Sequence, residues 1–270
     1  PISYVGNMIL SPRGTTTSGD NMVLQNVPTL TIYGDLTING ASNSSAIGLS
    51  WNTNDGFYSF SNKYLTVEKT VTIRGNLNIN GGALTYYDDA VPQHLVVDGN
   101  INISSATSGA CILVWDRGWG WQPYHDGPTL DNTLTIGGNV INNGVTHPTY
   151  TFFSGLNLYR NDATPHWVDV RFTGSNNSVV TGSGTVNYHE VTVNKGTSQA
   201  STLTFNSTGT FTTQTDNWLT LQNGTLIYNR TGNFNISTGS AFTVAPTAGL
   251  TINTPSNVYI GNSSSDANDL

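Results

Sequence analysis

The stretch Val71-Thr-Ile-Arg-Gly-Asn-Leu-Asn-Ile-Asn-Gly81 decides the fold predicted from this sequence. Apolar residues fall at every second position on both sides of Gly75, as in two half-buried β-strands joined by a bend. The glycine is expected in the middle inward position, where no side chain fits. Similar units recur at 30–40, 95–103 and 134–142, the last with Asn142 in an apolar position. The repetition predicts a wall, a corner and a second wall, built several times over.

The spacing of these units indicates a β-solenoid with loops inserted between some strands. Their central glycines are Gly34, Gly75, Gly99 and Gly138, so the intervals are 41, 24 and 39 residues. An interval of about 20 to 25 residues fits one coil, and the longer intervals fit two coils or one coil with an inserted loop. Short alternating apolar pairs continue from Val168 to Ile260. We therefore expect an all-β chain folded as a right-handed parallel β-helix.

A tandem β-sandwich is the alternative fold, because alternation of apolar residues alone does not distinguish a sandwich from a solenoid. The repeated Gly-Asn pair favours the solenoid, since sandwiches seldom repeat one turn chemistry at one place. The residue after each glycine is Asp35, Asn76, Asn100 or Asn139. We expect these side chains to form a ladder of hydrogen bonds from coil to coil.

Three regions are expected along the chain. Residues 1–28 are predicted to form an irregular cap or lead-in, because a polar, glycine-bearing loop separates their short apolar segments. Residues 29–262 are predicted to form one solenoid, with an aromatic loop inserted at 115–128, since no linker rich in proline and serine divides this range. Residues 263–270 lack apolar alternation and are predicted to form a flexible tail or a link to the next module.

The composition of the chain argues against several classes of protein. Only 9% of the residues are charged, and the net charge is −7 with no basic stripe, so a nucleic-acid binder is not expected. No apolar run approaches the roughly 20 residues that a membrane-spanning helix needs. Cys111 is the single cysteine, which excludes a disulfide framework. Since it stands among apolar residues, we expect it to be a small buried side chain.

Part of the sequence resembles a known group of proteins. The run Phe172-Thr-Gly-Ser-Asn-Asn-Ser-Val-Val-Thr-Gly-Ser-Gly-Thr-Val-Asn-Tyr-His-Glu-Val-Thr-Val-Asn-Lys195 is similar to a recurring segment of large surface proteins of Bacteroidetes. The Gly-Asn-Leu-Asn-Ile-Asn units and the run 219–228 resemble the same group. The resemblance implies a secreted repeat protein, often exported by the type IX system and often an adhesin. It implies no catalytic residues.

The aromatic segment 115–128 is the candidate ligand-binding site. If it is extended, two of its indoles lie on one face, and flat apolar rings with polar edges suit stacking on sugars. Nearby polar side chains would bond to hydroxyl groups. The alternative is that the aromatic side chains pack as a lid on the solenoid wall or on a neighbouring chain. The candidate ligand-binding residues are Trp115, Trp119, Trp121, Tyr124 and Asp126.

An enzyme acting on polysaccharides is a further possibility, because parallel β-helices include lyases and hydrolases. Such chemistry needs paired carboxylates or a calcium cluster with a basic residue. Asp88 with Asp89, and Asp116 with Asp126, are the local candidates. The five histidines show no metal-ligand spacing and are expected in loops or at the surface. No Asp-x-Asp-x-Asp run supports a structural calcium ion, so no cofactor is expected.

These observations lead to one expected function and one alternative. We expect a structural segment of a secreted bacterial adhesin or extracellular filament, located at the cell surface and in contact with glycans. Its expected partners are neighbouring modules of the same chain, or like subunits joined end to end, and surface polysaccharide. The alternative is a polysaccharide lyase or glycoside hydrolase with its groove beside 115–128.

Overall fold

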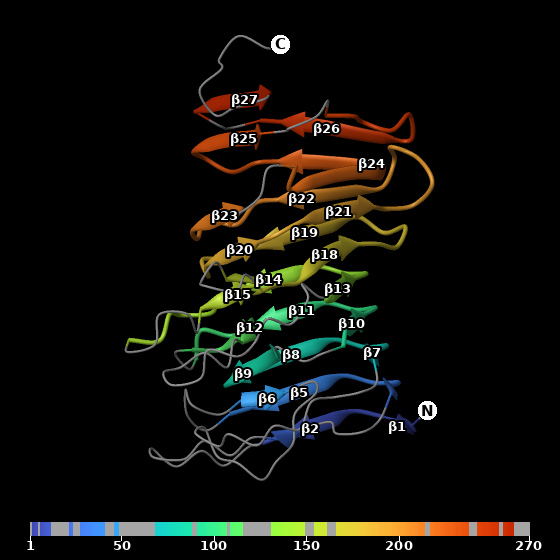
Figure 1. Ribbon diagram of the computed structural model, residues 1–270, viewed down its shortest axis with the longest axis vertical. Coiled ribbons are helices and arrows are strands. Elements are labelled where there is room, and N and C mark those ends of the chain that lie inside the picture. The colour runs from blue at the N-terminus through green and yellow to red at the C-terminus, as the bar shows by residue number, and fades with distance from the viewer. Residues whose placement is uncertain are drawn as a thin grey trace.

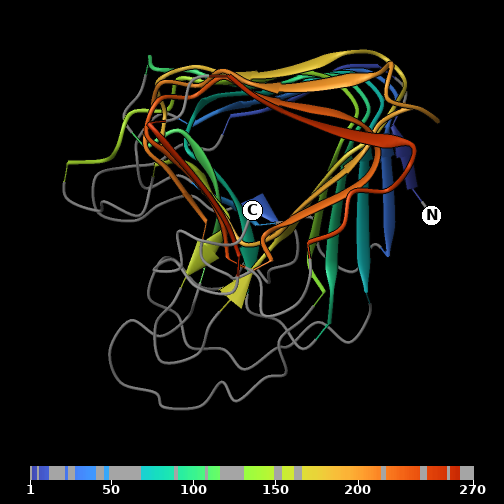
Figure 2. The same cartoon turned by 90° about the horizontal axis from the view of Figure 1, so that it is seen from above.

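The computed structural model describes residues 2–4, 6–11, 22–23, 28–40, 46–48, 68–87, 91–106, 109–115, 131–148, 154–160, 166–213, 217–237, 242–253 and 256–261. All regular secondary structure in these ranges is β-strand. The described residues contain no helix long and apolar enough to cross a membrane. From above, the chain winds anticlockwise as it rises toward the C-terminus, which makes the coil right-handed (Figures 1 and 2). Every described strand pairing except β16–β17 is parallel. The predicted parallel β-helix is therefore confirmed, and the alternative tandem β-sandwich is excluded.

The coil has three faces, which we name A, B and C in chain order (Figure 2). Face A contains β1 (Ile2–Tyr4), β4 (Thr29–Ile32), β7 (Lys69–Ile73), β10 (Gln93–Val97), β13 (Thr133–Ile136), β18 (Asp169–Phe172) and β21 (Val191–Asn194). Face B contains β2 (Met8–Leu10), β5 (Leu36–Asn39), β8 (Leu77–Gly81), β11 (Ile101–Ile103), β14 (Val140–Asn142), β19 (Ser178–Thr181), β22 (Thr202–Phe205) and β26 (Ala248–Ile252). Face C contains β3 (Met22–Val23), β6 (Ala46–Gly48), β9 (Ala83–Tyr87), β12 (Cys111–Trp115), β15 (Gly155–Asn157), β20 (Val186–Tyr188) and β23 (Phe211–Thr213).

The remaining strands lie at the C-terminal end or outside the coil. β24 (Leu219–Tyr228) runs round the corner from face A to face B, so the two faces form one 16-stranded sheet. β25 (Asn233–Ser237) and β27 (Asn257–Gly261) pair with each other after β24 and β26 respectively. β16 (Tyr159–Arg160) and β17 (His166–Trp167) form an antiparallel hairpin between face C and face A.

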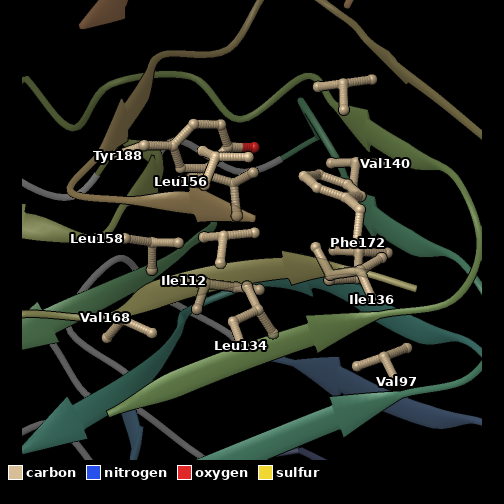
Figure 3. Close-up of a cluster of buried hydrophobic side chains, with 14 of the residues drawn as sticks. Val97, Ile112, Leu134, Ile136, Val140, Leu156, Leu158, Val168, Phe172 and Tyr188 are labelled. Carbon is tan, nitrogen blue, oxygen red and sulfur yellow. The ribbon is translucent and has the colours of Figure 1, made fainter. Parts of the chain in front are cut away.

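Inward side chains of the three faces form one core along the axis. On face A, Leu30, Val71, Leu95, Leu134 and Val170 are paired in register from coil to coil, and the last four are completely buried. Figure 3 shows such side chains from all three faces converging between the ribbons. Alternating apolar residues therefore fold as strands because each coil covers the apolar positions of the next.

The corner between faces A and B carries the predicted ladder of polar side chains. The Asx side-chain oxygen of one coil accepts a hydrogen bond from the backbone N–H of the next. These bonds are Asp35 N to Asn7 Oδ1 at 2.9 Å, Asn76 N to Asp35 Oδ1 at 2.7 Å, Asn100 N to Asn76 Oδ1 at 2.9 Å, Asn139 N to Asn100 Oδ1 at 2.8 Å, and Val179 N to Asn139 Oδ1 at 2.9 Å. The ladder satisfies amides at a bend, where strand pairing alone leaves them without partners.

The glycines at this corner exclude a side chain for a different reason from the one expected. A Cβ atom on Gly99 would lie 2.4 Å from the oxygen of Gly75, in the coil below, and one on Gly138 would lie 2.5 Å from the oxygen of Gly99. The obstacle is therefore the backbone of the preceding coil and not the core. Gly99 N also donates to Gly75 O at 3.1 Å, so the corners stack in direct contact.

The coil boundaries differ from the expected regions at the N-terminal side. β1, β2 and β3 lie within 1–28 and pair with β4, β5 and β6, so the predicted irregular lead-in contains the first coil. The 41-residue interval from Gly34 to Gly75 is one coil with a long connection between β6 and β7. Residues 263–270 lie outside the described residues.

The core of the C-terminal half contains larger side chains, and one of its corners contains a buried lysine. Its core contains Phe172, Tyr188, Phe205, Trp218, Tyr228 and Phe234. At the corner between faces A and B, the completely buried Lys195 donates from Nζ to Thr173 O at 2.6 Å and Ser178 Oγ at 2.9 Å. Burial lowers the pKa of this lysine. Its ammonium group lies at the same corner as the Asx ladder, which continues above Val179 with a bond from Thr202 N to Asn177 Oδ1 at 2.9 Å.

Candidate functional site

The corner between faces C and A, which we call the CA corner, receives the two longest connections between successive described strands. They are residues 49–68, between β6 and β7, and residues 116–132, between β12 and β13. The β16–β17 hairpin is inserted at the same corner, and it lies outside the triangle of the coil in Figure 2. By contrast, only three residues separate β7 from β8 at the corner between faces A and B. The two longest additions to the coil thus lie along one edge, while the connections 11–21 and 143–154 lie at the corner between faces B and C.

The predicted ligand-binding segment begins and ends at the CA corner. Trp115 is the last residue of β12, where its backbone pairs with Tyr87 of β9. The chain re-enters the coil at Thr133, the first residue of β13. The other predicted binding residues, Trp119, Trp121, Tyr124 and Asp126, lie outside the described residues, as do Asp88, Asp89 and Asp116.

A described group of side chains occupies the same corner in the adjoining coils. We call Tyr159, Trp167, Asp169, His189 and Glu190 the corner cluster. The imidazole of His189 stacks on the Trp167 ring, with centroids 4.4 Å apart, and on the Tyr159 ring, with centroids 5.4 Å apart. Both strands of the hairpin also contact β12, which leads into the segment 116–130. The corner cluster therefore lies next to the strand that ends at Trp115.

Hydrogen bonds anchor the hairpin to the coil. Val168 N donates to Leu158 O at 2.9 Å, closing the hairpin at its base. Asn187 Nδ2 donates to Tyr159 O at 2.8 Å, and Asn132 Nδ2 donates to Trp167 O at 3.4 Å. The rings of the hairpin are consequently held by the coils on both sides, which fixes their orientation before any ligand binds.

Charged groups of the corner cluster interact with one another. His189 Nδ1 lies 2.8 Å from Asp169 Oδ1. Partial burial raises the pKa of Glu190, and the negative charge of Asp169 raises it further, while His189 opposes the shift. A carboxyl group that binds its proton more tightly than usual thus lies beside a second carboxylate. Such an arrangement can donate and accept hydrogen bonds and can transfer a proton.

The sequence did not reveal the corner cluster. Asp169 and His189 are 20 residues apart and meet only because β18 and β21 stack in adjacent coils. The expectation that the histidines lie in loops or at the surface holds for His189, which stands in the turn between β20 and β21 although it is only 7% exposed, whereas His94 lies within β10. The available signal was the coil length, since residues about one coil apart lie side by side.

The predicted buried cysteine lies on face C, outside the corner cluster. Cys111 is completely buried on face C, and burial raises the pKa of its thiol, so the prediction of a small buried side chain is confirmed. Within the described ranges, no group of three or more His, Cys, Asp or Glu side chains is arranged to hold a metal ion.

Comparisons with known proteins give no relative for this chain. No protein-family model, no curated protein and no solved structure matches it.

Proposed function

We propose that this chain is a stiff structural segment of a secreted bacterial surface protein and that it contacts glycans through the CA corner. The observation that carries the proposal is that the two longest connections and the corner cluster lie along one edge of the coil. Loops placed on a rigid scaffold are a common way to build a binding surface.

The regular part of the coil supports the structural role. Parallel pairings run without interruption through face A, from β1 to β24, and the Asx ladder adds side-chain bonds along one edge. Bending such a coil would stretch these bonds on one side, which is the physical basis of stiffness. The resemblance of 172–195 to surface proteins of Bacteroidetes supports a place outside the cell, with type IX export as the proposed route.

The aromatic and acidic side chains at the CA corner support glycan binding. Trp167 is partly exposed, and its ring is held in place by His189, which stacks in turn on the buried Tyr159. Asp169 and Glu190 supply hydrogen-bond acceptors for sugar hydroxyls beside those rings. Trp119, Trp121, Tyr124 and Asp126 would add further contacts from the neighbouring segment, with Trp115 at its base.

A panel of soluble polysaccharides tests this proposal by tryptophan fluorescence and by calorimetry. We expect binding that is lost in a Trp119→Ala/Trp121→Ala variant and weakened in Trp167→Ala. Tyr33→Ala is the matched control, because Tyr33 is an aromatic residue 58% exposed at the corner between faces A and B. Equal losses in the control, or no binding by the unaltered chain, would contradict a glycan role for the CA corner.

A glycan-active enzyme is the second candidate, favoured by the raised pKa of Glu190 beside Asp169. A carboxyl group whose pKa is raised, beside a second carboxyl group, is the kind of pair that supplies the acid and the base for cleavage of a glycosidic bond. The same panel distinguishes the two functions, because an enzyme releases reducing or unsaturated ends. Product that disappears in Glu190→Gln, with binding retained, would support the enzyme.

A further inference from the structure

Face B presents a surface without charge. None of its eight strands, β2, β5, β8, β11, β14, β19, β22 and β26, contains a charged residue. At the adjoining corner the carboxylate of Asp35 is already engaged by Asn76. Face A differs, since its strands contain Lys69, Asp169 and Arg171. The net charge of −7 is therefore carried by other parts of the molecule.

The outward side chains of face B are open to solvent. Asn80 is exposed, Asn102 is partly exposed, and Ile141 is 42% exposed. By contrast, Leu113, an outward residue of face C, is completely buried. Face B is also the side of the triangle opposite the CA corner in Figure 2, so the hairpin inserted at that corner does not cover it.

Five polar side chains of β5, β8 and β11 form a group on face B, which we call the amide grid. They are Thr37, Asn39, Asn78, Asn80 and Asn102. Asn102 Nδ2 donates to Asn78 Oδ1 at 2.8 Å, and Asn80 Nδ2 donates to Asn39 Oδ1 at 2.9 Å. Thr37, Asn78 and Asn102 are in register, one in each coil. These bonds orient the amide groups before any ligand binds.

The amide grid keeps hydrogen-bonding capacity that the bonds between coils do not use. An asparagine side chain has two N–H donors and an oxygen with two acceptor sites. Asn78 accepts one bond from Asn102, and its Nδ2 lies 3.5 Å from Thr37 Oγ1, so at least one donor and one acceptor site remain. Successive coils repeat this arrangement about every 4.8 Å. Since a hydroxyl group both donates and accepts, the grid matches a surface of hydroxyl groups.

Other classes of partner fit face B less well. Protein interfaces depend on anchors that are most often Trp, Tyr or Arg, and the eight strands contain none of these. Nucleic acids are bound through cations that neutralise their phosphates, and the same strands contain none. An acidic polysaccharide would also be repelled by the net charge of −7. The chemistry of the face therefore favours a neutral polymer of sugars.

We propose that face B lies flat on the surface of a neutral crystalline polysaccharide, such as cellulose or chitin, and that the amide grid bonds to its hydroxyl groups. A crystalline surface suits a rigid sheet face, because both partners are ordered before contact and little conformational entropy is lost. Ile9 and Ile141, in register with the grid in the coils below and above it, are exposed and can contact the apolar C–H faces of sugar rings. This site extends the proposed contact with glycans to a second surface and does not use the CA corner.

Asn78→Asp tests the grid with little change of shape. The new carboxylate still accepts the bond from Asn102, but the N–H donors are lost and a negative charge is placed on face B. Asn194→Asp is the matched control, because its carboxylate likewise keeps a bond, from Asn223 Nδ2 at 2.8 Å, and lies on face A. Both variants change the net charge equally. Ile141→Asp serves if Asn78→Asp fails to give the spectrum of the folded chain.

Adsorption isotherms on microcrystalline cellulose and on chitin, read as protein removed from solution, are the measurement. We expect the unaltered chain and Asn194→Asp to adsorb to at least one of these solids, and Asn78→Asp to adsorb at least about tenfold more weakly. Added salt should change the isotherm little, because the contact is uncharged. The proposal is overturned if the unaltered chain adsorbs to neither solid, if Asn78→Asp adsorbs as well as the unaltered chain, or if Asn194→Asp loses as much.

The Trp119→Ala/Trp121→Ala variant separates this inference from the proposed function. That variant should still adsorb to the solid through face B, while its binding of soluble polysaccharide at the CA corner is lost. Conversely, Asn78→Asp should keep the binding of soluble polysaccharide. Adsorption that is lost in the tryptophan variant and kept in Asn78→Asp would assign the contact with the solid to the CA corner and overturn the proposal.

Discussion

Replacing Gly99 by alanine should open the stack at the corner between faces A and B. The new Cβ would lie 2.4 Å from the oxygen and 2.7 Å from the carbonyl carbon of Gly75, and 2.9 Å from Asn76 Oδ1. Two of these atoms are backbone and cannot rotate away. The coil that contains Gly99 must therefore move off the coil below.

The cost follows from the bonds that this movement breaks. Gly99 N to Gly75 O, at 3.1 Å, and Asn100 N to Asn76 Oδ1, at 2.9 Å, both cross the corner. Two hydrogen bonds at about 1 kcal/mol each, plus about 1–3 kcal/mol for overpacking, give about 3–5 kcal/mol. Alanine also lowers the conformational entropy of the unfolded chain, which stabilises the folded protein by about 0.4–1 kcal/mol. We expect the free energy of unfolding to fall by about 2–4 kcal/mol.

Equilibrium urea unfolding followed by circular dichroism measures the loss, and amide hydrogen exchange at Gly99 and Asn100 locates it. Gly249→Ala is the control, because its Cβ would meet the side chain of Thr225, with Oγ1 at 2.7 Å, and that side chain can rotate at the cost of one exposed hydrogen bond to Gln199 O. The control should change stability by less than about 1 kcal/mol. An equal effect in the two variants, or unchanged exchange at Gly99, would show that backbone contact does not close this corner.

Two further predictions concern buried polar groups. Asn100→Ala leaves the N–H of Asn139 without its acceptor, so stability should fall by about 1–2 kcal/mol, with faster exchange at that amide in hydrogen-exchange spectra. Burial raises the pKa of Tyr86 and of Tyr188 above the ordinary value near 10, so the unfolded chain releases these protons first and the melting temperature should fall as pH rises above about 10. Lys195 opposes this trend, because its lowered pKa makes stability rise with pH below its ordinary value. The hydroxyl of Tyr188 has no hydrogen-bond partner among the described residues, so Tyr188→Phe should keep stability at neutral pH and reduce the alkaline loss; an unchanged alkaline loss would contradict this assignment.

The candidate site was only partly accessible from the sequence. A local feature, the aromatic segment that begins at Trp115, was visible because its residues are contiguous. The corner cluster was not, because Asp169 and His189 are separated by a complete coil. Placing them together requires the number of residues in that coil, which depends on turns such as 182–185 whose length the apolar pattern does not specify.

By itself, the sequence determined the strands, their inward faces and the chemistry of one corner. Alternating apolar residues specify which side of a strand is buried, and the repeated Gly-Asx pair specifies a bend that repeats from coil to coil. Only the tertiary structure decided that the glycines avoid the preceding coil, that the first coil begins within 1–28, and that Lys195 bonds across the corner that carries the Asx ladder. The physical reason is that period-two patterning is local, whereas each of these features depends on which coil lies above or below, and stacking alone sets that neighbour.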